Sequence, residues 1–570
     1  MRLQWGGISI SQNQQYQSMK RIFLITLMAG SMALTSFAGG LLTNTNQSAQ
    51  FVRMLSRNAS LGIDAVYYNP AGVMKLENGF HISLNNQSIF QKRQVSSTYP
   101  LLNNSDYAGT VNAPLYPSGF AVYKMDNLAI SAGFGIIGGG GSANFSDGLP
   151  SFEIPITDLV PGLAGLSQLP APLTANVTGY NADLYFDGSS VFMGVQLGAS
   201  LKISDMLSGY LGVRYVPATN GYNGHIKNID LKVNGNYVNA QTFLSSTASG
   251  AATMATQASA AASQLSATAG SLSPFISGGA GGLTMGQLQT MGQLSEAQVT
   301  QLSGALISVG VPSTAVGSLT ISQIQGTFNT AAGSYTAASQ QLTGTAGLLN
   351  ATAAGLGDKQ VETKQTGAGF TPIVGFNYSP SDRFNLAVKY EHKTSLELTN
   401  STTRDDLGLF PDGQKSASDI PGMLAVGVGF NPSKLIETQL SYNLYFDKGV
   451  SWGNNVRSGM KREIESNSWE LALGVQLNLT DRFAFSFGGM TSNPGIADSY
   501  QSDFAYSNPS VTAALGFEYK LSKKLTFDAG YMNVFYKDVE VPFTRNTIAY
   551  KDTYGKTTFG LGFGLTYSIF

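Results

Sequence analysis

The sequence predicts an all-β protein: an antiparallel transmembrane β-barrel of about 14 strands, with an N-terminal hatch inside the lumen. After residue 79, apolar residues alternate with polar or small ones in segments of about ten residues, as in barrel strands. Short and long connections alternate along the chain, which is typical of outer-membrane barrels. Only 12% of the 570 residues are charged, whereas soluble domains contain about 25%.

The composition also argues against several classes of function. The formal net charge is −1 and there is no Lys/Arg cluster, so we expect no nucleic-acid partner. The chain has no cysteine, which excludes a disulfide scaffold, a thiolate nucleophile and a thiolate metal site. We expect no cofactor and no metal.

The N-terminus has the pattern of a secretory signal peptide. Lys20 and Arg21 precede the apolar run 22–34, and Ser36-Phe37-Ala38 is a small-x-small cleavage site. The alternative is a membrane anchor, but about 13 apolar residues are short of the ~20 that a spanning helix needs. We predict a signal peptide over residues 1–38, with Met19 as an alternative start and 1–18 as a possible upstream extension. The predicted location is the outer membrane of a Gram-negative bacterium.

Residues 39–78 are predicted to form the hatch. They contain small polar residues, a short helical stretch and the turn Asn69-Pro70-Ala71-Gly72, with no period-2 alternation. The barrel then occupies residues 79–570. We predict that Asn69, Pro70, Ala71 and Gly72 form the gate, because proline fixes φ and makes the turn stiff enough to move as a unit.

Fourteen segments have strand-like patterning, an even number as in bacterial single-chain barrels. They are 80–90, 118–125, 128–137, 190–203, 207–216, 367–378, 384–398, 423–430, 435–446, 469–479, 483–490, 511–519, 525–536 and 557–570. Tight links such as Asp126-Asn127 and Thr480-Asp481 alternate with long loops rich in Gly, Asn, Asp and Ser. Short links on the periplasmic side and long loops outside are expected of such a barrel.

The alternation also assigns the two faces of the wall. Leu471, Leu473 and Phe487 are predicted to face lipid. Charged residues are predicted to face the lumen, because a charge on the lipid face costs ~2–4 kcal/mol near the midplane. These inward residues are Lys389, Glu391, Lys393, Glu437, Glu470, Glu518 and Asp528. Phe570 is one residue out of phase with the apolar face of the last strand.

An insertion at residues 238–365 interrupts the barrel pattern in the third long loop. From 240 to 357 the only charged residue is Glu296, and Ala, Ser, Thr, Gln, Gly and Leu dominate. Residues 295–309 are predicted to be helical, with Ser295 and Gln298 in a capping-box pattern. We expect short, weakly amphipathic helices. Either a flexible low-complexity loop or a helical cap with an apolar capture surface fits this composition.

Two motifs of catalytic or binding type lack their context. Gly133 to Gly138 matches G-x-G-x-x-G, but it lies within a strand and no helix follows to receive a pyrophosphate. His81, His225 and His392 are scattered along the sequence. Inward carboxylates are expected in any barrel with a hydrated lumen, so we predict no catalytic residue and no enzyme.

Glycine weakens a strand. The cluster Gly138, Gly139, Gly140 and Gly141 is therefore predicted to leave the third strand imperfectly sealed, as a lateral opening.

In its layout the mature chain resembles the long-chain fatty acid transporter family of outer-membrane proteins (the FadL/TodX type). The resemblance rests on residues 39–77, above all Asn69-Pro70-Ala71-Gly72, which is similar to the N-P-A hatch motif of that family. The segment 421–427 and the last strand, with Tyr567, support it.

The resemblance implies a monomeric barrel that takes up long-chain fatty acids or similar hydrophobic molecules passively. Ligand would displace the hatch and leave sideways into outer-membrane lipid past a kinked third strand. An inward cation, Lys389 or Lys393, is a candidate to bind the carboxylate. The alternative function is a surface adhesin or binding protein, whose long loops engage a partner while the barrel serves as an anchor.

Overall fold

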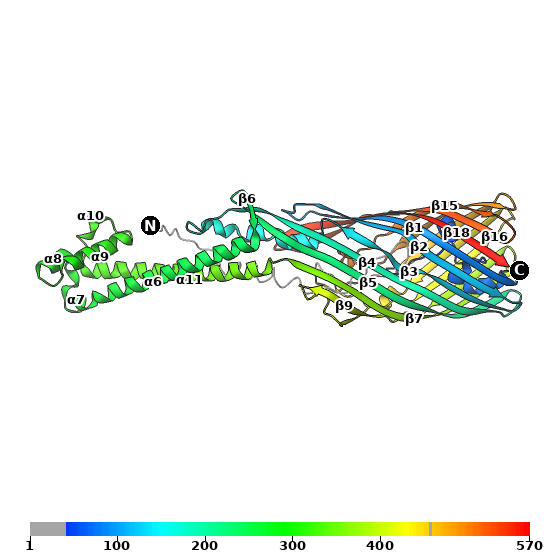
Figure 1. The fold of residues 1–570 in the computed structure, drawn as a ribbon, viewed down its shortest axis with the longest axis horizontal. Coiled ribbons are helices and arrows are strands. Elements are labelled where there is room, and N and C mark those ends of the chain that lie inside the picture. The colour runs from blue at the N-terminus through cyan, green and yellow to red at the C-terminus, as the bar shows by residue number, and fades with distance from the viewer. Residues whose placement is uncertain (1–40, 455–458, 570) are drawn as a thin grey trace. The chain divides into compact units, whose positions relative to one another are not determined.

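Fourteen antiparallel strands form a closed barrel, which confirms the predicted fold class and strand number. The computed structural model describes residues 41–454 and 459–569. The predicted signal peptide, residues 1–38, and Phe570 lie outside the described residues. Neighbouring strands of the barrel pair in chain order, and β1 pairs with β18 to close it (Figure 1).

The barrel strands have the following bounds. They are β1 Gly79–Ser97, β2 Asp106–Lys124, β3 Leu128–Phe145, β4 Val177–Lys202, β5 Leu207–Val233, β7 Lys359–Ser381, β8 Phe384–Glu391, β11 Met423–Phe430, β12 Ile436–Tyr445, β13 Trp469–Asn478, β14 Phe483–Asn493, β15 Ser510–Lys520, β16 Leu525–Tyr536 and β18 Ile548–Ile569. Four short strands extend the hairpins: β6 Asn236–Asn239, β9 Glu397–Asp405, β10 Lys415–Ala417 and β17 Val539–Arg545.

Every predicted strand is present, but several are longer than the pattern indicated. We call the end of the barrel with the tight links the turn end and the other the loop end. The extra length lies at the loop end. There the backbone pairing continues, although the residues no longer alternate between apolar and polar as they do where one face contacts lipid. The predicted strand 384–398 was wrong as one element. It ends at Glu391 and β9 begins at Glu397, because the polar run 392–395 leaves the ladder.

The predicted faces of the wall are confirmed. On β13, Leu473 is 54% exposed while Glu470 is 1% exposed. On β14, Phe487 is 44% exposed and Ser486 is fully buried. An outward apolar surface with an inward polar one on a closed barrel is the architecture of an outer-membrane protein. Among the described residues, no helix is long and apolar enough to cross a membrane.

The hatch folds into three short helices: α2 Ala49–Met54, α3 Ala65–Tyr68 and the 3-10 helix η2 Pro70–Lys75. α2 begins where Ser48 Oγ accepts a hydrogen bond from Phe51 N at 3.0 Å. All six residues of α2 are buried. Glycines on the inner wall allow this packing, because a Cβ on Gly530 would lie 2.6 Å from Arg53 N. The hatch therefore fills the lumen, as predicted.

The insertion is mostly helical. Its elements are α6 Ala240–Ser271, α7 Ser273–Ser277, η4 Ala280–Gly282, α8 Met285–Thr290, α9 Glu296–Ser308, α10 Ser313–Val316 and α11 Ile321–Gly355. The capping box predicted at Ser295 and Gln298 is confirmed at the start of α9. The prediction of short helices was wrong for α6 and α11, which have 32 and 35 residues. They lie side by side in Figure 1.

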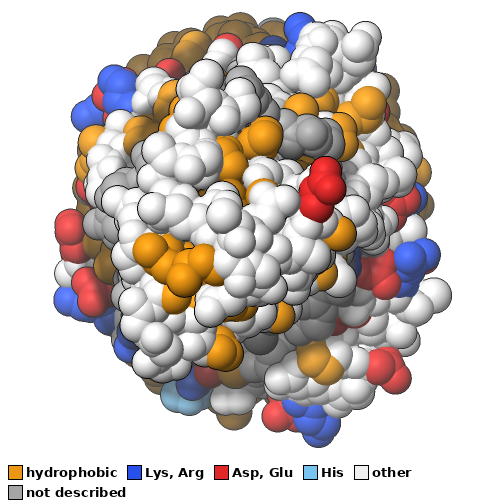
Figure 2. Space-filling model, turned by 90° about the vertical axis from the view of Figure 1, so that its left-hand side faces the viewer, with side chains coloured by type: hydrophobic (Ala, Val, Ile, Leu, Met, Phe, Trp, Pro, Cys, Tyr) orange, Lys and Arg blue, Asp and Glu red, His pale blue; other side chains and the backbone are white. Residues whose placement is uncertain are grey.

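Small residues let α6 and α11 pack closely along their length. The buried residues of α6 follow a repeat of four and three residues: Leu244, Ala248, Ala251, Ala255, Ala258, Ala262, Leu265 and Ala269. A heptad pattern of this kind makes a coiled-coil seam, and alanine lets the two helices approach closely. Figure 2 faces the side on which α7–α10 are drawn in Figure 1, and its nearest side chains are mainly uncharged.

The remaining helices are short. They are α4 Pro150–Thr157, α5 Leu159–Gly162, η3 Ala164–Gln168, η5 Asp447–Gly449 and η6 Asp498–Tyr500.

Candidate functional site

The predicted gate is anchored to the wall at the turn end. Asn69 Nδ2 donates to Ser60 O at 3.0 Å and to Asn377 Oδ1 of β7 at 2.7 Å. Ser200 Oγ of β4 donates to Pro70 O at 2.7 Å, and Ser208 Oγ of β5 donates to Ala71 O at 2.8 Å. The turn Asn69–Gly72 is thus held by three strands through neutral hydrogen bonds.

Gly72 is required by the close packing of this turn. A Cβ there would lie 2.7 Å from Ser60 O, and it would also run into the Asn69 side chain. Pro70 is the first residue of η2, where its missing N–H costs nothing and its fixed φ favours the helix. The Asn-Pro-Ala-Gly sequence therefore has a local structural reason, and its role as a gate stays a prediction.

An ion-pair cluster ties α2 to the opposite wall. Arg53 Nε lies 2.8 Å from Asp528 Oδ1, and Arg53 Nη2 lies 3.0 Å from Glu518 Oε2. Gln50 Nε2 donates to Asp528 Oδ2 at 2.7 Å. Two of the predicted lumen carboxylates thus hold the hatch. A buried guanidinium of this kind is tolerated because it is paired and hydrogen-bonded.

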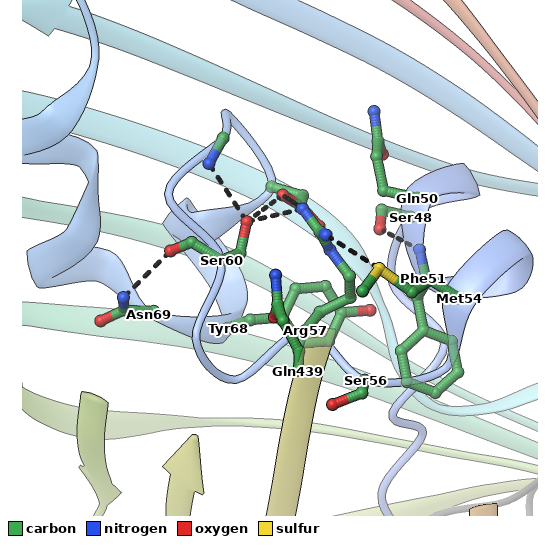
Figure 3. Close-up of polar contacts among 12 residues, drawn as sticks. Ser48, Gln50, Phe51, Met54, Ser56, Arg57, Ser60, Tyr68, Asn69 and Gln439 are labelled. Carbon is green, nitrogen blue, oxygen red and sulfur yellow. Dashed lines mark hydrogen bonds and ion pairs between the residues drawn. The ribbon is translucent and has the colours of Figure 1, made fainter. Parts of the chain in front are cut away.

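A second arginine rigidifies the hatch itself. Arg57 Nε and Nη2 reach Asp64 Oδ2 and Oδ1 at 2.7 and 2.8 Å, in a bidentate pair. Ser60 Oγ donates to Asp64 Oδ1 at 2.6 Å. Figure 3 shows Arg57 and Ser60 in contact, with Asn69 donating to the Ser60 carbonyl. The loop that carries this network leads directly into the predicted gate.

The wall is interrupted next to the predicted lateral opening. The pairs between β2 and β3 jump from Thr110–Asn144 to Gly119–Phe134. β3 also bulges against β4, once between Ile136 and Gly138 and once between Gly139 and Gly141. Gly139 and Gly140 have φ values of +65° and +117°, which L side chains rarely adopt. The predicted glycine cluster Gly138–Gly141 therefore lies at a kink, beside a stretch where β2 and β3 are not hydrogen-bonded.

The other side of this interruption was not predicted. β2 carries Pro114 and Pro117 within the unpaired stretch. A proline cannot donate to a ladder, so it is expected only at edges and bulges. Two prolines inside a barrel strand were the sequence signal that could have located the gap on β2.

Residues at the start of the hatch take over the free edge of β3. Asn44 N donates to Ile137 O at 2.7 Å, and Asn44 Nδ2 donates to Gly139 O at 2.8 Å. Gln47 Nε2 donates to Ile136 O at 2.8 Å. The hatch thus donates to three carbonyls of β3 in the stretch where β2 and β3 do not pair. Sequence reasoning placed Asn44 and Gln47 in the hatch but gave them no role.

Both predicted carboxylate-binding lysines already have partners. Lys389 Nζ donates to Glu391 Oε1 and to Tyr67 O, each at 2.7 Å. Glu391 also pairs with Arg214 at 2.6 Å, so one carboxylate is shared by two cations. Lys393 Nζ lies 2.8 Å from Asp419 Oδ2 and is partly exposed. A role for Lys389 and Lys393 in carboxylate binding stays a prediction.

The other singled-out residues do not form a common site. Glu470 Oε2 accepts from Thr45, Asn443 and Tyr445 at 2.7, 3.0 and 2.8 Å. Glu437 accepts from Gln439 at 3.0 Å. His81 contacts Ser568, His225 contacts Asp183 and His392 contacts Tyr390. Among the described residues, no group of His, Cys, Asp and Glu is placed to hold a metal.

Comparisons with known proteins bear on the fold. No family model matches the chain, and no curated protein matches it by sequence. Its structure is similar to that of a Pseudomonas aeruginosa FadL homologue. The TM-score is 0.52 and the identity 13%, over 93% of this chain and 99% of that one.

Two toluene transporters are also similar. TodX of P. putida has a TM-score of 0.45 and TbuX of Ralstonia pickettii one of 0.43, each at 12% identity over 89% of this chain and 94% of the other. The chain shares the fold of the FadL homologue. The similarity to the two toluene transporters is too low to carry an argument.

Proposed function

We propose that the protein is a passive outer-membrane channel for hydrophobic molecules, with long-chain fatty acids as the favoured substrates. The observation that carries this proposal is the joint construction of plug and wall. The hatch that blocks the lumen also donates hydrogen bonds to β3 in the stretch where β2 and β3 do not pair. Displacing it would unblock the lumen and free the edge of β3 in one step.

The physical chemistry of the substrate supports a sideways exit. Burying methylenes contributes ~0.8 kcal/mol each, so an acyl chain is most stable in an apolar environment. A water-filled pore that leads to an aqueous compartment offers no such environment. A passage that ends at the kink of β3, beside lipid, avoids the transfer into water.

Uptake of labelled oleate tests the proposal. Cells with the protein are expected to take up oleate faster than cells without it. A variant with Asn69→Ala and Pro70→Ala loses the bonds to Ser60 and Asn377, so its hatch is easier to displace. We expect at least twofold faster uptake at low oleate concentration.

The matched control for this variant is Glu77→Gln, which changes an exposed side chain at the end of the hatch and should behave as the unaltered protein. Equal uptake in all strains, including the one without the protein, would show that it does not carry oleate.

A second candidate function is an adhesin or binding protein. The observation in its favour is the ordered helical pair α6 and α11, with its small apolar core at α7–α10 around Leu288, Leu306 and Phe328. A flexible loop would not need such a core. Loss of cell adhesion with unchanged oleate uptake, after deletion of residues 240–357, would favour this function for the insertion.

A further inference from the structure

Positive charge gathers on one side of the turn end, at three consecutive tight links. These links join β11 to β12, β13 to β14 and β15 to β16. Asp481 is the one acidic residue among residues 431–435, 479–482 and 520–524. The exposed cations in the same ranges are Lys434, Arg482, Lys520, Lys523 and Lys524. Because successive strands are neighbours in the wall, the three links lie next to one another.

The remaining tight links of the turn end carry balanced charge. Lys202 Nζ lies 2.6 Å from Asp205 Oδ1 in the link between β4 and β5. By contrast, Lys434, Arg482 and Lys520 form no ion pair with a described residue. The charge on this side of the turn end is therefore left without a counterion from the protein.

Two of these cations are opposite each other in the sheet. Lys520 N donates to Arg482 O at 2.8 Å, which extends the register of β14 and β15 by one pair beyond Phe483 and Tyr519. Like charges directly opposite each other on neighbouring strands repel. An anion that binds both side chains would remove this repulsion.

The three cations Lys434, Arg482 and Lys520 line one cavity, which has a volume of about 490 Å³. Two carboxylates, Asp481 and Glu518, also line it. Glu518 Oε2 already lies 3.0 Å from the Nη2 atom of the α2 arginine, so its charge is offset within the hatch. The cavity therefore keeps a net positive charge.

The backbone that carries these cations is fixed by hydrogen bonds. Thr480 Oγ1 accepts from Arg482 N at 3.2 Å and from Phe483 N at 2.9 Å. Asn478 Nδ2 donates to Lys434 O at 3.1 Å, which joins the first link to the second. The bases of the cationic side chains are thus positioned before any ligand arrives, which lowers the ordering cost of binding.

The cavity lies at the rim of the wall, because its lining comes from both faces. Ala484 is an inward residue and is 5% exposed, whereas Leu479 is 52% exposed. Phe483 also lines the cavity and stacks on Phe517 of the outer face at 5.9 Å. Cationic groups and lipid-facing apolar groups therefore meet at one place.

We propose that Lys434, Arg482 and Lys520 bind the phosphodiester head group of an anionic phospholipid from the surrounding membrane. Arginine matches phosphate oxygens in charge and geometry, and lysine adds point charge. The acyl chains of such a lipid lie against the outer face beside Leu479 and Phe483. Tight links face the periplasm in outer-membrane barrels, so the lipid belongs to that leaflet. This site is independent of what the channel carries and goes beyond the proposed function.

Native mass spectrometry of the purified full-length protein in neutral detergent tests the site. The probes are phosphatidylglycerol and phosphatidylcholine with identical acyl chains. Each cation near an anionic lipid surface strengthens binding about fivefold, so we expect at least tenfold tighter binding of phosphatidylglycerol. The triple variant Lys434→Gln/Arg482→Gln/Lys520→Gln should bind phosphatidylglycerol at least tenfold more weakly, with phosphatidylcholine binding unchanged within twofold.

The matched control is Lys202→Gln/Arg383→Gln/Lys523→Gln. It removes two lysines and one arginine from exposed positions of the turn end outside the cavity, and should keep its affinity for phosphatidylglycerol within threefold. Equal losses in the two triple variants would overturn the proposal, because they would show a general attraction to the whole turn end.

Folding of each variant is checked by its heat-dependent shift in electrophoretic mobility. If the triple variant does not fold, Arg482→Gln alone provides the measurement, with an expected loss of about fivefold in affinity for phosphatidylglycerol. An unchanged affinity in folded Arg482→Gln would contradict the site.

Two competitors identify the source of the anion. A large excess of inorganic phosphate should leave the affinity for phosphatidylglycerol within twofold, because phosphate lacks the chains that contact the outer face. Displacement by phosphate would assign the cavity to a free anion and overturn the lipid site. Equal affinity for the two lipids, together with binding of a soluble polyglutamate peptide, would assign the surface to an acidic protein segment instead.

Discussion

Four of the buried arginines inside the barrel differ in how fully they are paired. Arg53 and Arg57, in the hatch, reach carboxylates at 2.8 and 2.7 Å. Arg93 and Arg462, near the loop end, each have a guanidinium nitrogen without a partner. The ion pairs of Arg53 and Arg57 fix the plug in the lumen and stiffen it.

A buried carboxylate in a loop makes stability depend on pH. Asp447 of η5 is fully buried. Burial raises its pKa from 3.8 to about 6, although Ser468 N donates to it at 3.0 Å. Asp447 Oδ1 has no partner. Between pH 4 and 6 the unfolded chain ionises while the folded one keeps the proton, so stability falls as pH rises. The total loss is about 3 kcal/mol.

Asp447→Asn should remove this dependence, because an amide oxygen can still accept from Ser468 and does not ionise. Urea unfolding in lipid vesicles at pH 4, 5, 6 and 7 provides the measurement. We expect the midpoint of the unaltered protein to fall across this range relative to that of the variant. Parallel pH profiles for the two proteins would contradict the assignment.

At the residue scale, sequence reasoning found the inward face but not the partners. Parity along a strand places Lys389, Glu470 and Asp528 in the lumen, and they lie there. It cannot tell which inward residues meet, because Arg93 and Lys556 are neighbours only through the closure of the barrel. The bond between Asn69 and Asn377 joins the hatch to a strand that begins after the insertion, and no local pattern predicts it.

At the scale of the elements, the interruption between β2 and β3 can be closed by design. A Cβ on Gly141 would lie 3.9 Å from Val111 Cβ, within the range that a disulfide requires. The chain has no other cysteine. Val111→Cys/Gly141→Cys should therefore form one disulfide across the unpaired stretch. We expect oxidation to lower oleate uptake at least fivefold and a reductant to restore it.

The two single-cysteine variants are the controls, since each carries one substitution but cannot form the bridge within one molecule. A complete disulfide, shown by mass spectrometry, together with undiminished uptake would refute exit through this part of the wall. The hatch would then be the gate of a different route.

The strands were predictable because contact with lipid on one face imposes a strict alternation of apolar and polar residues. This alternation ends where a strand leaves the membrane. The same fact explains why the loop-end extensions were missed. The long helices were missed for another reason. Alanine at the seam positions of α6, such as Ala251 and Ala255, contributes little to a hydrophobic pattern, although close helix packing depends on it. A search for the repeat of four and three residues would have found α6.

At the scale of the whole molecule, the chain comprises two compact units. One contains the barrel wall and hatch, and the other contains the helical insertion. Deleting residues 240–357 should leave the barrel able to assemble, because its strands pair with one another. We expect the variant to keep the heat-dependent shift in electrophoretic mobility of a folded barrel.

Oleate uptake by this deletion variant should stay within twofold of that of the unaltered protein. An unfolded barrel would contradict the independence of the two units. Loss of uptake from a folded barrel would instead make the insertion part of the transport route. A variant that replaces only residues 280–317 with a short glycine-rich loop, and keeps all of α6 and α11, serves as a matched control.

The overall architecture was readable from the sequence because a hatch, an even strand number and alternating loop lengths are mutually consistent. The relation between hatch and wall was not. It depends on Asn44 and Gln47 meeting the carbonyls of β3, and nothing in the spacing of those residues indicates a sheet edge.

The edge of β3 is completed by a segment that is not one of the barrel's strands. On the proposed mechanism, permeability is then governed by an equilibrium rather than by a fixed radius, because the passage exists only in the fraction of molecules whose hatch has left β3. Ligand acts by changing that fraction. Two proteins with identical barrels could differ widely in leakiness through substitutions near Asn44 alone.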